Sequence, residues 1–260
     1  MTGRFAIYAV PGTGPDGTPG TALRQRAEQW LGRSVSGQPV TPAVPADWTR
    51  AAVDAITANA RRYGFHATLK APFRLAEPHA PGELEAALAR FAAGHQAIAV
   101  PALTLARLGR FYALVPGTPA APLHTLADAV VTGFDQFRAP PTAAETARRQ
   151  PDSLTPRQRE LLAAWGYPYV LDEFRFHLTV TDQISPGHQP AVERALTRWF
   201  GPDLGATVPV DSLALFTEDA PGAPFALHAL YPLQPAPDGA SPGRPPAERG
   251  RPPAEREGTR

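Results

Sequence analysis

Alternating apolar and polar positions predict two β-strands that carry the same polar motif. Residues 62–73 read Arg-Tyr-Gly-Phe-His-Ala-Thr-Leu-Lys-Ala-Pro-Phe, and residues 173–181 read Glu-Phe-Arg-Phe-His-Leu-Thr-Val-Thr. Side chains i and i+2 of a strand lie on the same face, so each stretch is expected to present a histidine, hydroxyl groups and a cation on one face and apolar side chains on the other. The polar faces comprise His66, Thr68 and Lys70 in the first stretch and Arg175, His177, Thr179 and Thr181 in the second.

The remaining pattern predicts an α+β fold in which the elements recur in the same order. Strands are expected over residues 4–10, 98–105, 110–115, 173–182, 207–216 and 224–231. Helices are expected over residues 21–31, 49–62, 81–93, 123–137, 157–165 and 189–200. Each motif strand is followed by a helix and two further strands. We therefore expect two similar lobes of antiparallel sheet with flanking helices, about residues 4–137 and 170–233, and the active-site cleft between them.

Length and composition favour one bilobal domain over residues 1–235. The chain has 260 residues, of which 43% are apolar, and this supports a buried core. Residues 236–260 contain the sequence Arg-Pro-Pro-Ala-Glu-Arg twice and almost nothing apolar. We expect this Pro/Arg-rich tail to be disordered and assign it no function.

Charge and residue usage exclude several classes of protein. The sequence has no cysteine, which excludes disulfides and thiolate metal sites. The formal net charge of +1 argues against a general nucleic-acid binder. No apolar run approaches the ~20 residues of a membrane span, and the N-terminus lacks the layout of a signal peptide. A cytoplasmic protein without a membrane partner is expected.

Lys70 is the only lysine among the 25 Lys and Arg residues. Its presence is either chance or a requirement for a compact ammonium group, such as a point-charge contact to phosphate. Position 70 is therefore a candidate substrate-binding position.

The paired histidines suggest acid–base chemistry on a phosphoester. Histidine titrates near pH 6.5, so one imidazole of a pair can serve as the base while the other, protonated, serves as the acid. The threonines, with Lys70 or Arg175, can neutralise phosphoryl oxygens as charge builds up in the transition state. Such an assembly suits in-line displacement at a strained cyclic phosphodiester. The sequence leaves open which histidine is acid and which is base.

The remaining polar and aromatic residues are weaker candidates. Five other histidines have no comparable neighbours, namely His79, His95, His124, His188 and His228. Tyr63 and Tyr112 are secondary candidates for stacking on a sugar or base, or for donating a hydrogen bond to phosphate. Arg62 and Arg110 are secondary candidates of the same rank.

These residues also carry a family resemblance. Residues 65–69, Phe-His-Ala-Thr-Leu, and residues 176–180, Phe-His-Leu-Thr-Val, resemble the paired His-x-Thr-x motifs of the two-histidine (2H) phosphoesterase superfamily. The longer stretch 62–73 is similar to a branch named for phosphonate metabolism. The resemblance implies a metal-independent cyclic phosphodiesterase without cofactor. In it, His66 and His177 are the acid–base pair, and Thr68 and Thr179 bind phosphate.

Three other functions are compatible with parts of the pattern. An RNA-end 2′,3′-cyclic phosphodiesterase or ligase would need a basic, aromatic-lined surface, which the near-zero charge disfavours. A non-catalytic module binding a phosphorylated metabolite would not need a titrating pair. A metal-dependent hydrolase would need a third ligand at strand spacing, which neither motif supplies. We expect a hydrolase that acts as a monomer on a small phosphorylated molecule, with no nucleic-acid partner.

Overall fold

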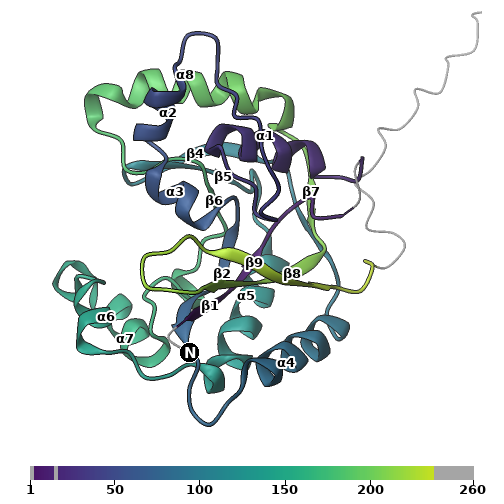
Figure 1. The fold of residues 1–260 in the computed structure, drawn as a ribbon, viewed down its shortest axis with the longest axis vertical. Helices are drawn as coiled ribbons and strands as arrows, with labels where there is room; N and C mark the ends of the chain where they lie inside the picture. The colour runs from purple at the N-terminus through teal and green to yellow at the C-terminus, as the bar shows by residue number, and fades with distance from the viewer. Residues whose placement is uncertain (1–2, 15–16, 237–260) are drawn as a thin grey trace, which may run out of the picture.

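The computed structural model describes residues 3–14 and 17–236 (Figure 1). All of the expected disordered tail except Ala236 lies outside the described residues. No helix in the described part of the chain is both long enough and apolar enough to cross a membrane.

The larger sheet has four antiparallel strands. Its order is β2 (Ala67–Arg74), β1 (Arg4–Ala9), β8 (Ser212–Glu218) and β9 (Ala226–Pro232). Two helices, α4 (Pro81–Ala93) and α5 (Ala121–Gly133), pack against it and lie below it in Figure 1. Strand β1 is fully buried from Ala6 onward, so the centre of this sheet is part of the hydrophobic core.

A smaller three-stranded sheet lies in the upper part of Figure 1, with order β4 (Thr104–Leu108), β5 (Phe111–Val115) and β6 (Leu178–Thr179). Above it lie α1 (Thr21–Leu31), α2 (Arg50–Ala55) and α8 (Gln189–Phe200). The fully buried Trp30 of α1 packs near Trp199 and Phe200 of α8 and donates its indole N–H to the Val180 carbonyl at 2.8 Å. This bond ties the helical layer to the second motif.

The remaining elements connect these layers. Strand β3 (Ile98–Val100) pairs with β7 (Val208–Val210). Helix α3 (Ala58–Tyr63) leads into the first motif. Helices α6 (Ala143–Ala147) and α7 (Pro156–Trp165) lie beside the larger sheet at the lower left of Figure 1. Short 3₁₀ turns follow α5, α6 and α8 and precede β6 and α8.

The predicted α+β class with antiparallel sheets and flanking helices is confirmed. Helix α1 has the predicted bounds because Gly32 adopts the left-handed conformation (φ 67°) that ends a helix. Thr49 caps α2, its side chain accepting a hydrogen bond from the Ala52 N–H. The single helix predicted for residues 49–62 is wrong, since α2 and α3 are separate. The chain breaks at Ile56, whose carbonyl accepts a hydrogen bond from the Asp182 N–H at 2.7 Å.

Three predicted strands also differ from the structure. The strand predicted over residues 207–216 is divided at Asp211 into β7 and β8, which belong to different sheets. The strand predicted over residues 98–105 is divided into β3 and β4 at Ala102, which has a positive φ of 46°. The strand predicted over 173–182 forms a ladder only at Leu178–Thr179, after a 3₁₀ turn at Leu171–Glu173. Its alternating pattern is real, because Phe174, Phe176, Leu178 and Val180 are all buried, but most of it has no neighbouring strand.

The predicted assignment of lobes to consecutive halves of the chain is wrong. Strands β8 and β9 from the second half complete the sheet of β1 and β2, while β6 pairs with β5 from the first half. The predicted recurrence of elements is present along the chain, but alternation identifies a strand without identifying its partner. Each motif strand is consequently at the edge of a different sheet.

Candidate active site

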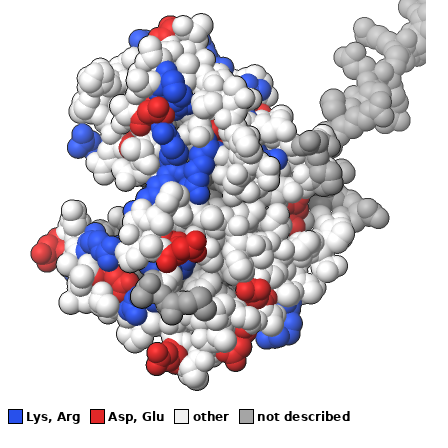
Figure 2. All heavy atoms as spheres, in the orientation of Figure 1, with Lys and Arg blue, Asp and Glu red and all other residues white. Residues whose placement is uncertain are grey.

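A cavity of about 410 Å³ lies between the two sheets and contains both motifs. The larger sheet contributes Tyr8 and Thr68, the smaller sheet contributes Phe111 and Thr179, and Tyr63 at the end of α3 lies between them. The surface is hollowed on the left of Figure 2, with blue cationic atoms on both of its walls.

His66 is held by short-range contacts within the first motif. Its Nδ1 lies 2.9 Å from the Gly64 carbonyl oxygen, which can only accept, so Nδ1 carries the proton. In the neutral ring Nε2 is then an acceptor, and it lies 3.2 Å from Thr68 Oγ1. Gly64 has a φ of 76°, a conformation that glycine adopts without strain and that turns its carbonyl toward the ring.

Aromatic packing partly buries the His66 ring. The ring stacks on Tyr8 with centroids 3.9 Å apart, and Tyr63 lies on another side at 6.2 Å. Burial lowers the pKa of His66 to about 4, with smaller contributions from His177 and the Arg33 guanidinium. His66 is therefore neutral at pH 7, and its Nε2 can accept a proton.

His177 repeats the local geometry of His66. Its Nδ1 lies 2.7 Å from the Arg175 carbonyl oxygen, again two residues earlier, so its Nε2 is also the acceptor of the neutral ring. Burial lowers the pKa of His177 as well, opposed by this backbone hydrogen bond. Phe111 is its aromatic neighbour, with centroids 5.8 Å apart. Two imidazoles with matched tautomers thus face one cavity.

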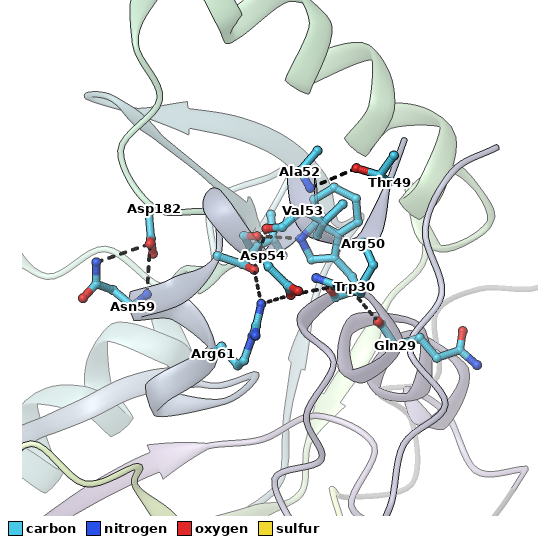
Figure 3. A network of polar contacts seen from close by, with 12 residues as sticks. Gln29, Trp30, Thr49, Arg50, Ala52, Val53, Asp54, Asn59, Arg61 and Asp182 are labelled. Carbon is cyan, nitrogen blue, oxygen red and sulfur yellow. Dashed lines mark hydrogen bonds and ion pairs between the residues drawn. The ribbon is translucent and has the colours of Figure 1, made fainter. Parts of the chain in front are cut away.

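The two motifs are tied together through α3. Asp182, one residue beyond the second motif, accepts a hydrogen bond from the Asn59 backbone N–H at 2.9 Å (Figure 3). It accepts another from the Ala60 backbone N–H, also at 2.9 Å. At the other end of α3, Arg33 donates to the carbonyls of Arg61 and Arg62. This short helix is therefore fixed at both ends, and it carries Tyr63 as its last residue, three residues before His66.

Comparison with known proteins assigns the family. Residues 68–226, more than half of the chain, match the family described as Protein of unknown function (DUF1045). The chain belongs to the DUF1045 family.

Two curated relatives of this DUF1045 chain carry the name ribose 1,5-bisphosphate phosphokinase PhnN. The protein from Janthinobacterium sp. (strain Marseille) is 37% identical over 231 residues, covering 85% of this chain and 49% of the relative. The protein from Laribacter hongkongensis (strain HLHK9) is 36% identical over 231 residues, covering 87% of this chain and 51% of the relative. The chain spans about half the length of these relatives.

Among solved structures, the chain is similar to E. coli LigT complexed with 3′-AMP, with 14% identity and a TM-score of 0.41 over 90% of this chain and 99% of that one. It is also similar to a structure described as a phosphoesterase, with 14% identity and a TM-score of 0.38 over 89% of this chain and 98% of that one.

Five of the seven predicted site residues of this DUF1045 protein line the cavity, namely His66, Thr68, Tyr63, His177 and Thr179. Thr181 lines it too, with its hydroxyl engaged by the Tyr112 N–H at 2.9 Å. Tyr112 itself points away, since its hydroxyl donates to Glu193 of α8 at 3.2 Å. Arg110 is exposed, and Arg62 pairs with the buried Glu218.

Lys70 does not share the face of Thr68, contrary to the prediction. Ile7 of β1 pairs with Lys70 while the next residue, Tyr8, pairs with Thr68, so Leu69 is an extra residue in β2. Such a bulge changes the direction of the side chains that follow it. The Lys70 ammonium group is buried and donates to Asp135 Oδ1 and the Val131 carbonyl, both at 3.1 Å.

Arg175 also lies outside the cavity. Its side chain is exposed beside Phe176 and His124, and the residue serves His177 through its backbone carbonyl. The expectation of a second cation beside His177 fails because residues 174–177 are not held in a ladder that would orient this side chain.

Tyr8, Arg4 and Arg149 also line the cavity, and the sequence pattern did not predict them as site residues. The signal for Tyr8 was the alternation of the first predicted strand, which places its side chain on the same face as that of Arg4. Arg149 lies beyond the short helix α6 in a segment without a periodic pattern, and no local signal marks it. Among the described residues, no three His, Cys, Asp or Glu side chains form a group that could hold a metal ion.

Proposed function

We propose that this protein is a metal-independent phosphoesterase that hydrolyses a small cyclic phosphodiester by acid–base catalysis with His66 and His177. One observation carries the proposal. Two His-x-Thr motifs, far apart in the chain and on different sheets, place both histidines in one cavity with the same Nδ1 hydrogen bond and therefore the same unprotonated Nε2. A site that only bound phosphate would not need two matched imidazoles.

The surroundings of the two rings suggest a role for each. His66, with its pKa lowered to about 4, takes the proton from water as the water oxygen attacks phosphorus. The bond from phosphorus to one ring oxygen breaks, and His177 in its imidazolium form gives a proton to that oxygen. The anionic substrate favours this protonation. Thr68 and Thr179 donate to the phosphoryl oxygens, and the product is a phosphate monoester.

The curated relatives suggest a metabolic context for this site. Their name describes a kinase, but this chain has no G-x-x-x-x-G-K-[ST] phosphate-binding loop, since its only lysine is followed by alanine. We assign the kinase activity to the part of those relatives that this chain does not cover. A cyclic phosphate of a ribose-type sugar is the substrate we favour, within phosphonate metabolism, to which both the resemblance of residues 62–73 and the PhnN name refer.

The test is hydrolysis of a small panel of cyclic phosphates in EDTA, including 2′,3′-cyclic nucleotides and ribosyl 1,2-cyclic phosphate. We expect turnover of the sugar cyclic phosphate by the wild-type protein and loss of turnover in the His66→Ala/His177→Ala double variant. His228→Ala is the matched control, because this exposed histidine pairs with Glu85 on the surface.

Each alternative function has its own outcome in this assay. Preference for 2′,3′-cyclic nucleotides would indicate RNA-end chemistry, and loss of turnover in EDTA would indicate a metal-dependent hydrolase. Binding of phosphorylated ligands with no turnover of any compound would indicate a binding module.

A further inference from the structure

A second cavity of about 240 Å³ adjoins the cavity that holds the histidines. Both are lined by Arg4, Tyr63, Pro72 and Arg149, so they share a wall. The second cavity extends toward the end of β2 at Arg74. Arg4 and Tyr8 are on the same face of β1, four residues or about 13 Å apart. The two cavities therefore lie in sequence along one strand.

Arginine dominates the walls of the second cavity, although the whole chain is nearly neutral. Six guanidinium groups line it, those of Arg4, Arg62, Arg74, Arg138, Arg148 and Arg149. Four of them pair with three carboxylates, because the buried Glu218 is shared by Arg4 and Arg62. Asp135, the partner of Arg138, also pairs with Lys70. The cavity consequently carries an excess of positive charge.

Arg149 is the cation placed to bind a ligand. Among the described residues it has no carboxylate partner, and neither does its neighbour Arg148. The Arg149 guanidinium lies over the Tyr167 ring, 4.8 Å from its centroid, which leaves its in-plane N–H groups available. Arg149 also lines both cavities. A planar donor fork of this kind matches the oxygens of a phosphate group.

We propose that the second cavity binds a phosphomonoester carried by the same substrate whose cyclic phosphodiester lies between the histidines. The substrate class is then a small sugar with a cyclic phosphate at one end and a terminal phosphate at the other. A volume of about 240 Å³ suits a phosphate group with part of a sugar and is too small for a further nucleotide. This inference rests on the proposed function of the adjoining site.

The relatives' name agrees with this substrate class. Opening a 1,2-cyclic phosphate of a 5-phosphorylated ribose gives ribose 1,5-bisphosphate, when the bond from phosphorus to O2 breaks. That compound is the one in the name of both curated relatives.

The test compares two substrates that differ only in the terminal group, ribosyl 1,2-cyclic phosphate with and without a 5-phosphate. We expect kcat/KM to be at least about tenfold higher for the 5-phosphorylated compound, the scale of one hydrogen bond to a charged group. In Arg149→Gln this ratio should fall to near one. Arg90→Gln, which removes an exposed arginine on α4, should leave the ratio unchanged.

Binding of ribose 5-phosphate, measured by calorimetry, tests the cavity without requiring turnover. We expect binding to weaken at least about tenfold in Arg149→Gln and to persist in Arg90→Gln. Equal kcat/KM for the two substrates overturns the inference, and so does ribose 5-phosphate binding that is unchanged in Arg149→Gln. Either result leaves the proposed function intact. Conversely, Arg149-dependent binding without turnover supports the cavity and rejects the proposed function. Preference for an oligonucleotide ending in a 2′,3′-cyclic phosphate overturns the substrate class.

Discussion

His66 and His177 occupy the same position in the same motif, yet their surroundings differ. Both donate Nδ1–H to the carbonyl two residues earlier, at 2.9 and 2.7 Å. His66 stacks on Tyr8 at 3.9 Å, next to an eight-residue strand, whereas His177 has Phe111 at 5.8 Å and precedes a strand of two residues. The motif therefore determines the tautomer, and the packing around it determines how strongly each ring holds a proton.

The largest expected effect separates the two rings by the leaving group they require. With an alkyl cyclic phosphate, His66→Ala and His177→Ala should each lower kcat/KM by about 10²- to 10⁴-fold. With a p-nitrophenyl phosphodiester, whose leaving group needs no proton, His177→Ala should cost less than about tenfold while His66→Ala keeps its full effect. The reverse pattern would exchange the roles of base and acid.

The pH dependence of kcat/KM should be bell-shaped with an acidic optimum. His66 acts deprotonated, so activity is lost as the pH falls through its pKa of about 4. His177 acts protonated, so activity is lost as the pH rises through its pKa, which burial holds below 6.5. In His177→Ala, assayed with the p-nitrophenyl substrate, the alkaline limb should vanish and the limb near pH 4 remain. An optimum above pH 7 would contradict this assignment.

The partly buried His66 should also make folding stability depend on pH. Its pKa is lower in the folded protein than in the unfolded chain, so between about pH 4 and 6.5 the unfolded state binds more protons. Stability should therefore rise with pH across this window, by up to about 3 kcal/mol before any discount for partial exposure of the ring. Urea unfolding at pH 4.5 and 7 measures this change in the free energy of unfolding. If the change in the wild-type protein were no larger than in His66→Gln, the assignment to His66 would be rejected.

A smaller effect is expected at the link between the motifs. Asp182→Ala removes the acceptor for two backbone N–H groups at the start of α3 and should lower the free energy of unfolding by about 1–2 kcal/mol. Activity should fall about tenfold, because α3 positions Tyr63 and His66. Asp172→Ala is the control, since Asp172 pairs with Arg157 at a solvent-exposed site, where an ion pair contributes little to stability. Equal losses of stability and activity in Asp182→Ala and Asp172→Ala would contradict a specific role for Asp182.

Short-range patterns account for what could be predicted from the sequence. Helix α1 and the start of α4 at Pro81 depend on residues a few positions apart, and so does the Nδ1 geometry of each histidine. Strand alternation correctly placed Thr68 and Thr179 beside their histidines in the cavity. These features need no information about the partner strand.

Features that depend on distant partners were not predictable in the same way. The bulge at Leu69 arises from pairing with β1, and it moved Lys70 from the expected site into the core. The exchange of strands between halves depends on edges that only the folded sheet defines. Arg149 reaches the cavity from a segment with no regular pattern, so its role followed from the cavity and not from the sequence.

The smallest effect on activity is expected at Lys70, where sequence and structure disagree most. Lys70→Met removes the ammonium group from Asp135 and Val131, so it should destabilise the fold by about 1–2 kcal/mol, with Arg138 still neutralising Asp135. Because Lys70 faces away from both cavities, kcat/KM should stay within about twofold of wild type. A selective rise in KM at unchanged stability would restore Lys70 to the site and reject the bulge as the reason for its displacement.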